Sequence, residues 1–307
     1  MPIPVILDCD PGTDDAVAIL LALASPELSV LAITVAGGNV GLDHTLNNAL
    51  ALTALAGSSV SVHAGANRPL LGQFVSETGV HGENGLGGVV LPPGNAAAPG
   101  FASDVIRHLL REAPEPVTLI GIGPATNLAL ALTTEPDLTP QVKQIVLMSG
   151  AWAEGNVTPA AEFNAWSDPE ALAILLASTR PVIFATLELT AQALMTQARI
   201  AAWRALGTGS CLQAACDIQA TVPPSPRVDG TGSPLHDPCA VAWLLRPDLF
   251  TTRDCSVRMD LGPGPGRGRT LIDRWGRTGD PPNAMVMETV DPEALFELLG
   301  ERLARLP

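Results

Sequence analysis

Apolar segments of strand length alternate with helical segments along most of this sequence, and this alternation restricts the fold more than any other feature. The segments expected to form strands are residues 5–7, 28–35, 60–64, 117–122, 144–148 and 181–186, with helical patterns between them. Such alternation is typical of a mostly parallel sheet with helices on both faces. We therefore predict an α/β protein with an open, Rossmann-like sheet, formed by one domain over residues 1–307.

The pattern changes after residue 189, where extra helices are expected, including one over residues 238–245. Short strands at 257–260, 270–273 and 284–288 then predict a small late hairpin around a turn rich in glycine, proline and arginine. The turn is either solvated or a contact between subunits. Its basic residues are Arg258, Arg267, Arg269, Arg274 and Arg277.

Four carboxylates crowd the turn between the first predicted strand and the first predicted helix. Asp8, Asp10, Asp14 and Asp15 lie around a Pro-Gly pair that forces a turn. In a parallel sheet this turn lies at the carboxyl edge, where ligands bind. A helix N-terminus stabilises a carboxylate by only about 0.3–1 kcal/mol, so a hard cation such as Ca²⁺ or Mg²⁺ explains the cluster better. The alternative is a solvated helix start capped by Thr13 or Asp14.

Charge and cysteine usage narrow the class of partner. The net charge is −14 with a single lysine, so nucleic acid and anionic membranes are unsuitable partners, and a small neutral or cationic substrate fits better. The five cysteines show no C-x-x-C spacing, which argues against a disulfide framework or a zinc site. No apolar run is long enough for a membrane span, and no basic segment precedes the first strand. We expect a cytoplasmic protein.

Polar residues follow several of the predicted strands, and an open sheet could bring them together. Asn39 and Thr126 come after strands, and Asn164 lies in a polar loop that could also be simply solvated. Asp237 stands between His236 and a proline that opens an apolar helix, so it is either a site residue or an ordinary helix cap. Residues 65–100 form a long glycine-rich stretch, which is typical of a binding loop or lid.

The opening turn resembles the signature of nucleoside hydrolases, the inosine-uridine preferring N-ribosyl hydrolases. Residues 8–18 match the pattern D-x-D-P-G-x-D-D-A-x-A at every fixed position. Further matches occur in family order at 36–39, 123–127, 146–150, 154–156, 162–164 and 236–238. The resemblance implies hydrolysis of the N-glycosidic bond of ribonucleosides to free base and ribose, in purine and pyrimidine salvage.

The resemblance also implies one Ca²⁺ per subunit. Its protein ligands would be Asp10, Asp15, Asp237 and the backbone carbonyl of Thr126, and a ribose diol and a water would complete the shell. Asp10 would act as the general base on that water, while His236 would protonate the leaving base. Family members commonly form homodimers or homotetramers, so we expect an oligomer.

Other implied contacts hold the nucleoside. Asp14 and Asn164 would bind the 2′- and 3′-hydroxyls with Asn39 nearby, and Asn156 and Glu162 would bind the 5′-hydroxyl. Two residues complete the set: Met148, packed against the sugar, and His81, in a loop that closes on the substrate or is merely solvated.

This set of residues suits the chemistry. Cleavage passes through an oxocarbenium-like sugar that water attacks from the opposite face, and anionic walls stabilise the developing positive charge. A divalent ion lowers the pKa of the water, and a carboxylate removes its proton. Ca²⁺ accepts 6–8 oxygen ligands, which leaves room for a diol.

The residues expected to contact the nucleobase differ from those usual in the family. Members that cleave several nucleosides often have tyrosines on the helix before the His-Asp-Pro motif, and this chain has no tyrosine. Gln219 or Asp217 could substitute. A purine could stack on one of three tryptophans, although core or rim packing is the simpler role for each: Trp152, Trp166 and Trp275.

Two other functions remain open from the sequence. An Asp-x-Asp phosphatase would use Asp8 as nucleophile, Asp10 as acid/base and Mg²⁺, but it usually also needs a later lysine, and only Lys143 is present. A Ca²⁺-dependent protein that binds nucleosides without turnover is the non-enzymatic alternative.

Overall fold

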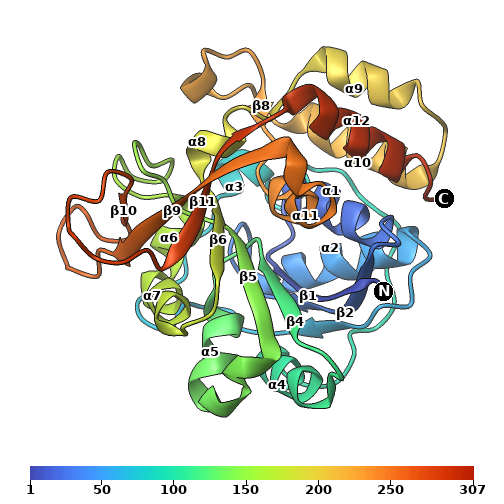
Figure 1. Cartoon of the computed structure of the whole chain (residues 1–307). Coiled ribbons are helices and arrows are strands. Elements are labelled where there is room, and N and C mark those ends of the chain that lie inside the picture. The colour runs from blue at the N-terminus through green and yellow to red at the C-terminus, as the bar shows by residue number, and fades with distance from the viewer.

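The computed structural model describes residues 1–307 and contains a large sheet and a small one (Figure 1). The strands are β1 (Ile3–Cys9), β2 (Leu28–Val35), β3 (Val62–Ala64), β4 (Val117–Gly121), β5 (Val142–Met148), β6 (Val182–Ala185), β7 (Leu194–Met195), β8 (Ser233–Pro234), β9 (Phe250–Met259), β10 (Thr270–Asp273) and β11 (Ala284–Val290). Nine of them form the large sheet in the order β10-β9-β11-β6-β5-β4-β1-β2-β3. Neighbours from β3 to β11 are parallel, whereas β9 runs antiparallel to β11 and β10. The predicted mostly parallel sheet with a late hairpin is confirmed.

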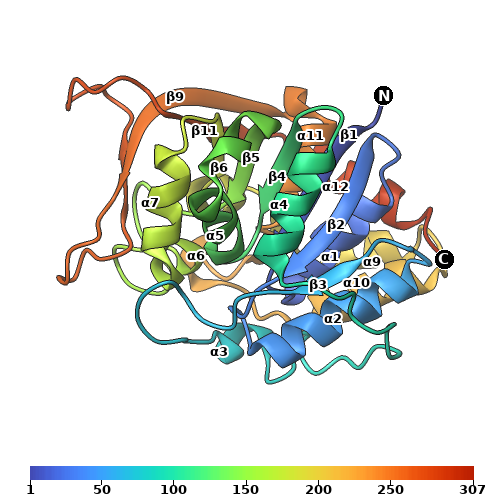
Figure 2. The same cartoon turned by 90° about the horizontal axis from the view of Figure 1, so that it is seen from below.

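Helices cover both faces of this sheet. They are α1 (Thr13–Leu23), α2 (Leu42–Leu55), α3 (Thr78–His81), α4 (Ala102–Glu112), α5 (Thr126–Thr134), α6 (Phe163–Ser167), α7 (Pro169–Ala177), α8 (Leu187–Thr190), α9 (Gln197–Arg204), α10 (Ser210–Thr221), α11 (Pro238–Leu245) and α12 (Pro292–Leu303). Three short 3₁₀ helices are η1 (Pro136–Gln141), η2 (Pro226–Val228) and η3 (Pro247–Leu249). Helices α4, α5 and α7 lie on one face, and α1, α2, α10, α11 and α12 lie on the other (Figure 2).

Strand β1 lies between β4 and β2 inside the large sheet and is buried on both faces, which explains its nearly continuous apolar sequence. Val5, Leu7 and Cys9 belong to the larger apolar core under α1, whereas Ile6 belongs to the smaller core under α4 and α5. Because side chains alternate along a strand, this division fixes which face each residue of β1 can reach. The carboxyl end of β1 is therefore held between two packed layers.

Some local predictions need correction. Neither Thr13 nor Asp14 caps α1, because Gly12 is the cap residue and the Asp15 carboxylate accepts its backbone N–H at 2.9 Å. The polar loop that contains Asn164 ends in α6, which is capped by the buried Glu162. Asp168 and Asp291 cap α7 and α12, because their side chains accept backbone N–H groups of the first turns.

The late hairpin carries exposed apolar side chains, and it forms ion pairs both within itself and to α7. Arg258, Arg267 and Arg274 pair with Asp280, Glu170 and Glu288. Leu261, Leu271 and Trp275 are exposed. The five cysteines are all free and buried, as expected. None of the helices is both long and apolar enough to cross a bilayer.

Candidate active site

One cavity of about 320 Å³ opens at the carboxyl edge of the large sheet. Asn39, Ile122 and Met148 line it where β2, β4 and β5 end, and Asp14 enters from the first turn of α1. This is the edge where parallel α/β sheets bind ligands. Most residues predicted to contact a nucleoside or its base also line this cavity: His81, Asn156, Glu162, Asn164 and His236.

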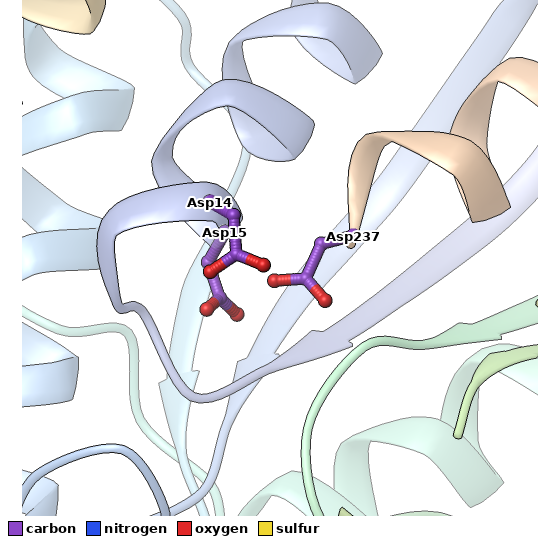
Figure 3. Close-up of side chains that lie close together, drawn as sticks. All are labelled: Asp14, Asp15 and Asp237. Atoms are coloured by element: carbon purple, nitrogen blue, oxygen red, sulfur yellow. The ribbon is translucent and has the colours of Figure 1, made fainter. Parts of the chain in front are cut away.

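The deep end of the cavity is acidic. Carboxylate oxygens of Asp14, Asp15 and Asp237 all lie within 4.8 Å of one another, although Asp237 comes from a distant part of the chain (Figure 3). Asp10 lies beside them at the end of β1, and all four side chains are buried. We call these four residues the acidic floor. The alternative of a solvated helix start for Asp14 and Asp15 is therefore wrong.

Burial and the charges of neighbouring carboxylates disfavour the charged forms of Asp10, Asp15 and Asp237. Desolvation, followed by the charge of Asp14, raises the pKa of Asp15 to about 7 and that of Asp237 well above its usual range. Desolvation and the charge of Asp15 also raise the pKa of Asp10. No ion pair of the structure involves any of the four. Such a set of buried oxygens fits a hard divalent cation.

Asp10 is held rigidly, with one oxygen left over. Its Oδ2 accepts the backbone N–H of Asn39 at 2.7 Å, whereas its Oδ1 is buried without any hydrogen-bond partner. Gly38 and Gly123 press against this carboxylate, and a Cβ at either glycine would collide with it. Buried polar atoms without partners are rare in native structures, so Oδ1 is a natural place for a ligand or a proton.

Asp15 and Asp237 are positioned in different ways. Asp15 accepts the backbone N–H groups of Asp10 and Gly12 at 3.2 and 2.9 Å, and the Asn39 side-chain amide at 3.0 Å. Asp237 occupies the cap position of α11, but its side chain makes no capping hydrogen bond. The ordinary capping role considered for Asp237 is thus not realised, and its carboxylate is available to the acidic floor.

The side chains of Asp8 and Thr126, which lie next to the acidic floor in the sequence or the fold, form hydrogen bonds with residues outside the floor. Asp8 does not line the cavity, because its carboxylate accepts Thr34 Oγ1 at 2.6 Å and Asn127 Nδ2 at 2.9 Å in the core. Burial raises its pKa to about 7. A phosphatase with Asp8 as nucleophile therefore does not fit this site. The Thr126 hydroxyl donates to Asp168 at 2.7 Å, which leaves the backbone carbonyl as the group that the resemblance assigns to the metal.

The side of the cavity next to β5 is polar, and its side chains are held by several hydrogen bonds to the backbone. Glu162 accepts backbone N–H groups of Gly150, Asn164 and Ala165 at 2.8–2.9 Å, although desolvation still raises its pKa. Asn164 donates through Nδ2 to the carbonyls of Ile122 and Met148, so its Oδ1 remains as an acceptor. The predicted alternative of a solvated loop is wrong for Glu162 and Asn164, since both are buried.

Both candidate histidines lie at the cavity wall: His81 is buried, which excludes a solvated loop position for it, and His236 is half-buried. The backbone N–H of Thr13 donates to His81 Nδ1 at 3.1 Å. His236 Nδ1 lies 2.7 Å from Thr190 Oγ1. Desolvation lowers the pKa of both imidazoles, while the nearby Asp14 charge opposes this shift in each case.

The outer wall of the cavity contains residues that the sequence did not single out. Residues 222–232, which we call the strap, contribute Val222 and a series of prolines, followed by Arg227. Gln219 lines the cavity and donates to the Thr13 carbonyl at 2.7 Å, whereas Asp217 pairs with Arg204 outside it. The three tryptophans considered for stacking do not line the cavity.

Comparisons with known proteins agree with this geometry. The sequence model of the inosine-uridine preferring nucleoside hydrolase family matches residues 5–297. The pyrimidine-specific ribonucleoside hydrolase RihA of Salmonella arizonae is 45% identical over 307 residues, and its Citrobacter koseri counterpart is 43% identical over 308, with 99% of each chain covered.

Solved structures share the fold over nearly the whole chain. A purine-preferring ribonucleoside hydrolase from Gardnerella vaginalis superposes with a TM-score of 0.90 at 33% identity, covering 98% of both chains. An inosine-guanosine nucleoside hydrolase gives the same score at 28% identity, covering 99% of both. The chain belongs to the nucleoside hydrolase family and is a hydrolase of the N-glycosidic bond of ribonucleosides.

Proposed function

We propose that this nucleoside hydrolase acts on pyrimidine ribonucleosides, releasing the base and ribose. The preference rests on the relatives named pyrimidine-specific, which share 43–45% identity with the chain, against 33% and 28% for the solved purine-preferring and inosine-guanosine enzymes. The observation that supports the mechanism is the unpartnered Oδ1 of Asp10 in the buried acidic floor.

We further propose that the acidic floor holds one Ca²⁺ per subunit through Asp10, Asp15, Asp237 and the carbonyl of Thr126. Bound there, the ion would orient the ribose diol and lower the pKa of a water. Buried carboxylates without cationic partners support this assignment. Asp14 belongs to the same cluster and lines the cavity, as Asp237 does, and from this position we assign it to the substrate.

In this mechanism Asp10 is the general base. Its Oδ2 is fixed by the Asn39 backbone, and the free Oδ1 accepts the proton of the attacking water. Asp14 and Asn164 bind the 2′- and 3′-hydroxyls, while Asn156 and Glu162 bind the 5′-hydroxyl. Asn39 and Met148 complete the sugar pocket. Their shared position around the cavity supports these roles.

Departure of the base requires a proton on the opposite side of the glycosidic bond. His236 is tethered at Nδ1 to Thr190, so its Nε2 is the atom that can face the leaving base. Burial lowers the pKa of His236, and the nearby Asp14 charge opposes this shift by favouring the protonated imidazole. His81 closes the same wall from α3 and contacts the substrate.

A panel of nucleosides tests this proposal. Purified protein would be incubated with uridine, cytidine, inosine, adenosine and guanosine in the presence of Ca²⁺, and released reducing sugar would be measured. We expect uridine and cytidine to be cleaved with the higher kcat/KM. Faster cleavage of inosine or guanosine would overturn the pyrimidine assignment without affecting family membership.

We also propose a homodimer or homotetramer in the cytoplasm. The exposed apolar side chains of the late hairpin support contacts between subunits, and five free cysteines fit a reducing compartment. Light scattering coupled to gel filtration would measure the mass, and a monomer at micromolar concentration would exclude the oligomer.

A further inference from the structure

Two chain segments lie at the wall of the cavity, and a single side chain joins them. The strap contributes residues 222–227, and the loop at residues 154–161 contributes Asn156 and Val157. Arg227 Nη1 donates to the carbonyls of Glu154 at 3.0 Å and Gly155 at 2.6 Å. These are the hydrogen bonds that connect the strap to the loop.

Each segment is ordered by its own backbone. Within the strap, Ser225 N–H donates to the Gly232 carbonyl at 2.8 Å, and Gly230 N–H donates to the Ser225 carbonyl at 3.1 Å. Within the loop, Asn156 N–H donates to the Ala161 carbonyl at 3.1 Å. The strap and the loop are therefore two small closed units, and Arg227 sets their relative position.

The 154–161 loop is also tightly packed at Gly155, where Arg227 binds, so a side chain cannot be added there without moving the backbone. A Cβ on Gly155 would collide with the carbonyls of Thr158 and Ala161. Asn156 follows directly, and its Oδ1 accepts the backbone N–H of Phe163 at 2.9 Å, next to Glu162. Asn156 is thus fixed from one side by Phe163 and from the other by the peptide groups that Arg227 holds.

We propose that Arg227 is a positioning residue that acts through the 154–161 loop on Asn156, and so on binding of the 5′-hydroxyl of the substrate. This inference rests on the proposed function, in which Asn156 and Glu162 hold that hydroxyl. Arginine suits the task because its guanidinium presents several donors in a fixed plane, whereas a lysine ammonium is a mobile point charge.

Uridine and 5′-deoxyuridine distinguish this role from a merely structural one. Displacing a positioning group by about 1 Å can cost up to about 100-fold in rate, and we expect Arg227→Gln to lower kcat/KM for uridine by about 10-fold or more. The wild-type enzyme and the variant should differ far less on 5′-deoxyuridine, which has no 5′-hydroxyl to position. Arg227→Lys should restore part of the loss on uridine.

Arg246→Gln is the matched control, because Arg246 is also exposed and hydrogen-bonded, to Asp248, but does not line the cavity. It should leave both substrates unaffected. Equal losses on the two substrates, or no loss on uridine, would overturn the role of Arg227. Failure of the wild-type enzyme to cleave uridine would instead contradict the proposed function. If Arg227→Gln does not fold, Arg227→Lys provides the same comparison.

Discussion

The acidic floor and the strap both contribute residues to one cavity, and they are built in contrasting ways. The floor is buried, and two of its side chains are held by several contacts: backbone N–H groups bind Asp10 and Asp15, glycines press on Asp10, and the Asn39 side-chain amide binds Asp15. The residues of the strap that reach the cavity are exposed or half-buried, and several are prolines. The strap joins its neighbour through one arginine.

This contrast indicates a division of labour. Groups that take part in bond cleavage need fixed positions and a low dielectric, which the floor provides. In the proposed mechanism the base would lie against the wall, where modest changes of contact would suffice to alter selectivity. We therefore expect substitutions in the floor to reduce kcat strongly and substitutions in the wall to change KM and the choice of base.

Asp10→Asn should have the largest effect. An amide has nearly the same shape, so it fits between Gly38 and Gly123, but it cannot accept the proton of water. Loss of a general base typically costs about 10²–10⁴-fold, and we expect kcat for uridine to fall by that amount with the fold intact by circular dichroism. Asp8→Asn is the matched control from the same strand face and should lower kcat far less. Unchanged kcat in Asp10→Asn would remove the base assignment.

Removal of divalent metal should have the second-largest effect on activity, and adding Ca²⁺ should restore the lost activity. Activity should disappear after chelation, and thermal unfolding should occur at a lower temperature. Without a cation, the floor must either bury negative charges or take up protons. Full activity after exhaustive chelation would contradict the metal assignment, and recovery with Mg²⁺ but not Ca²⁺ would change the identity of the ion.

The metal-free protein should also show a distinctive pH dependence of stability. Burial raises the pKa of Asp15 to about 7 and those of Asp10 and Asp237 above their usual range, whereas unfolded aspartates titrate near about 4. Above pH 4 the folded state therefore retains protons that the unfolded chain has lost, so stability falls as the pH rises through about 7. Melting temperatures of chelated protein should be higher at pH 6 than at pH 8.

Saturating Ca²⁺ should weaken or invert this trend, because the ion binds the deprotonated carboxylates. Melting curves at both pH values with and without Ca²⁺ provide the comparison. A metal-free protein whose melting temperature does not fall between pH 6 and pH 8 would contradict the raised pKa values of the floor.

The sequence predicted the floor much better than the wall. Periodicity gave β2 and α11 with their observed bounds, because strands and helices buried in a core have strong apolar patterns. The signature around Asp10 and the His236-Asp237 pair pointed to one sheet edge, because parallel strands end there. Capping was less predictable: Asp15, rather than Thr13 or Asp14, completes the start of α1 through its contact with Gly12.

The wall could not be predicted because its contacts are tertiary. Gln219 binds the carbonyl of Thr13, which is 206 residues away in the chain, and Arg227 binds backbone carbonyls that have no sequence signature. The burial of Glu162 likewise depends on N–H groups from the end of β5 and from α6. A polar loop sequence cannot reveal such donors.

Gln219→Ala should have an intermediate effect that concerns selectivity. Loss of the amide widens the wall beside Thr13, so the ratio of kcat/KM for uridine to that for inosine should fall by about 10-fold, the usual scale for small changes of pocket shape. Asp217→Asn is the matched control, because Asp217 lies on the same helix but pairs with Arg204 outside the cavity. A large fall in kcat with an unchanged ratio would place Gln219 with the floor.

The smallest effect on catalysis is expected for a substitution in the late hairpin, which belongs to neither the floor nor the strap. Trp275 is 77% exposed and does not line the cavity, so Trp275→Ser should leave kcat and KM for uridine unchanged while shifting an oligomer towards smaller species. Gel filtration with light scattering and steady-state kinetics on the same samples would test both effects. If Trp275→Ser changed the kinetic constants for uridine together with the oligomer mass, a second subunit would complete the wall of the cavity. The comparison of floor and strap would then have to include that subunit.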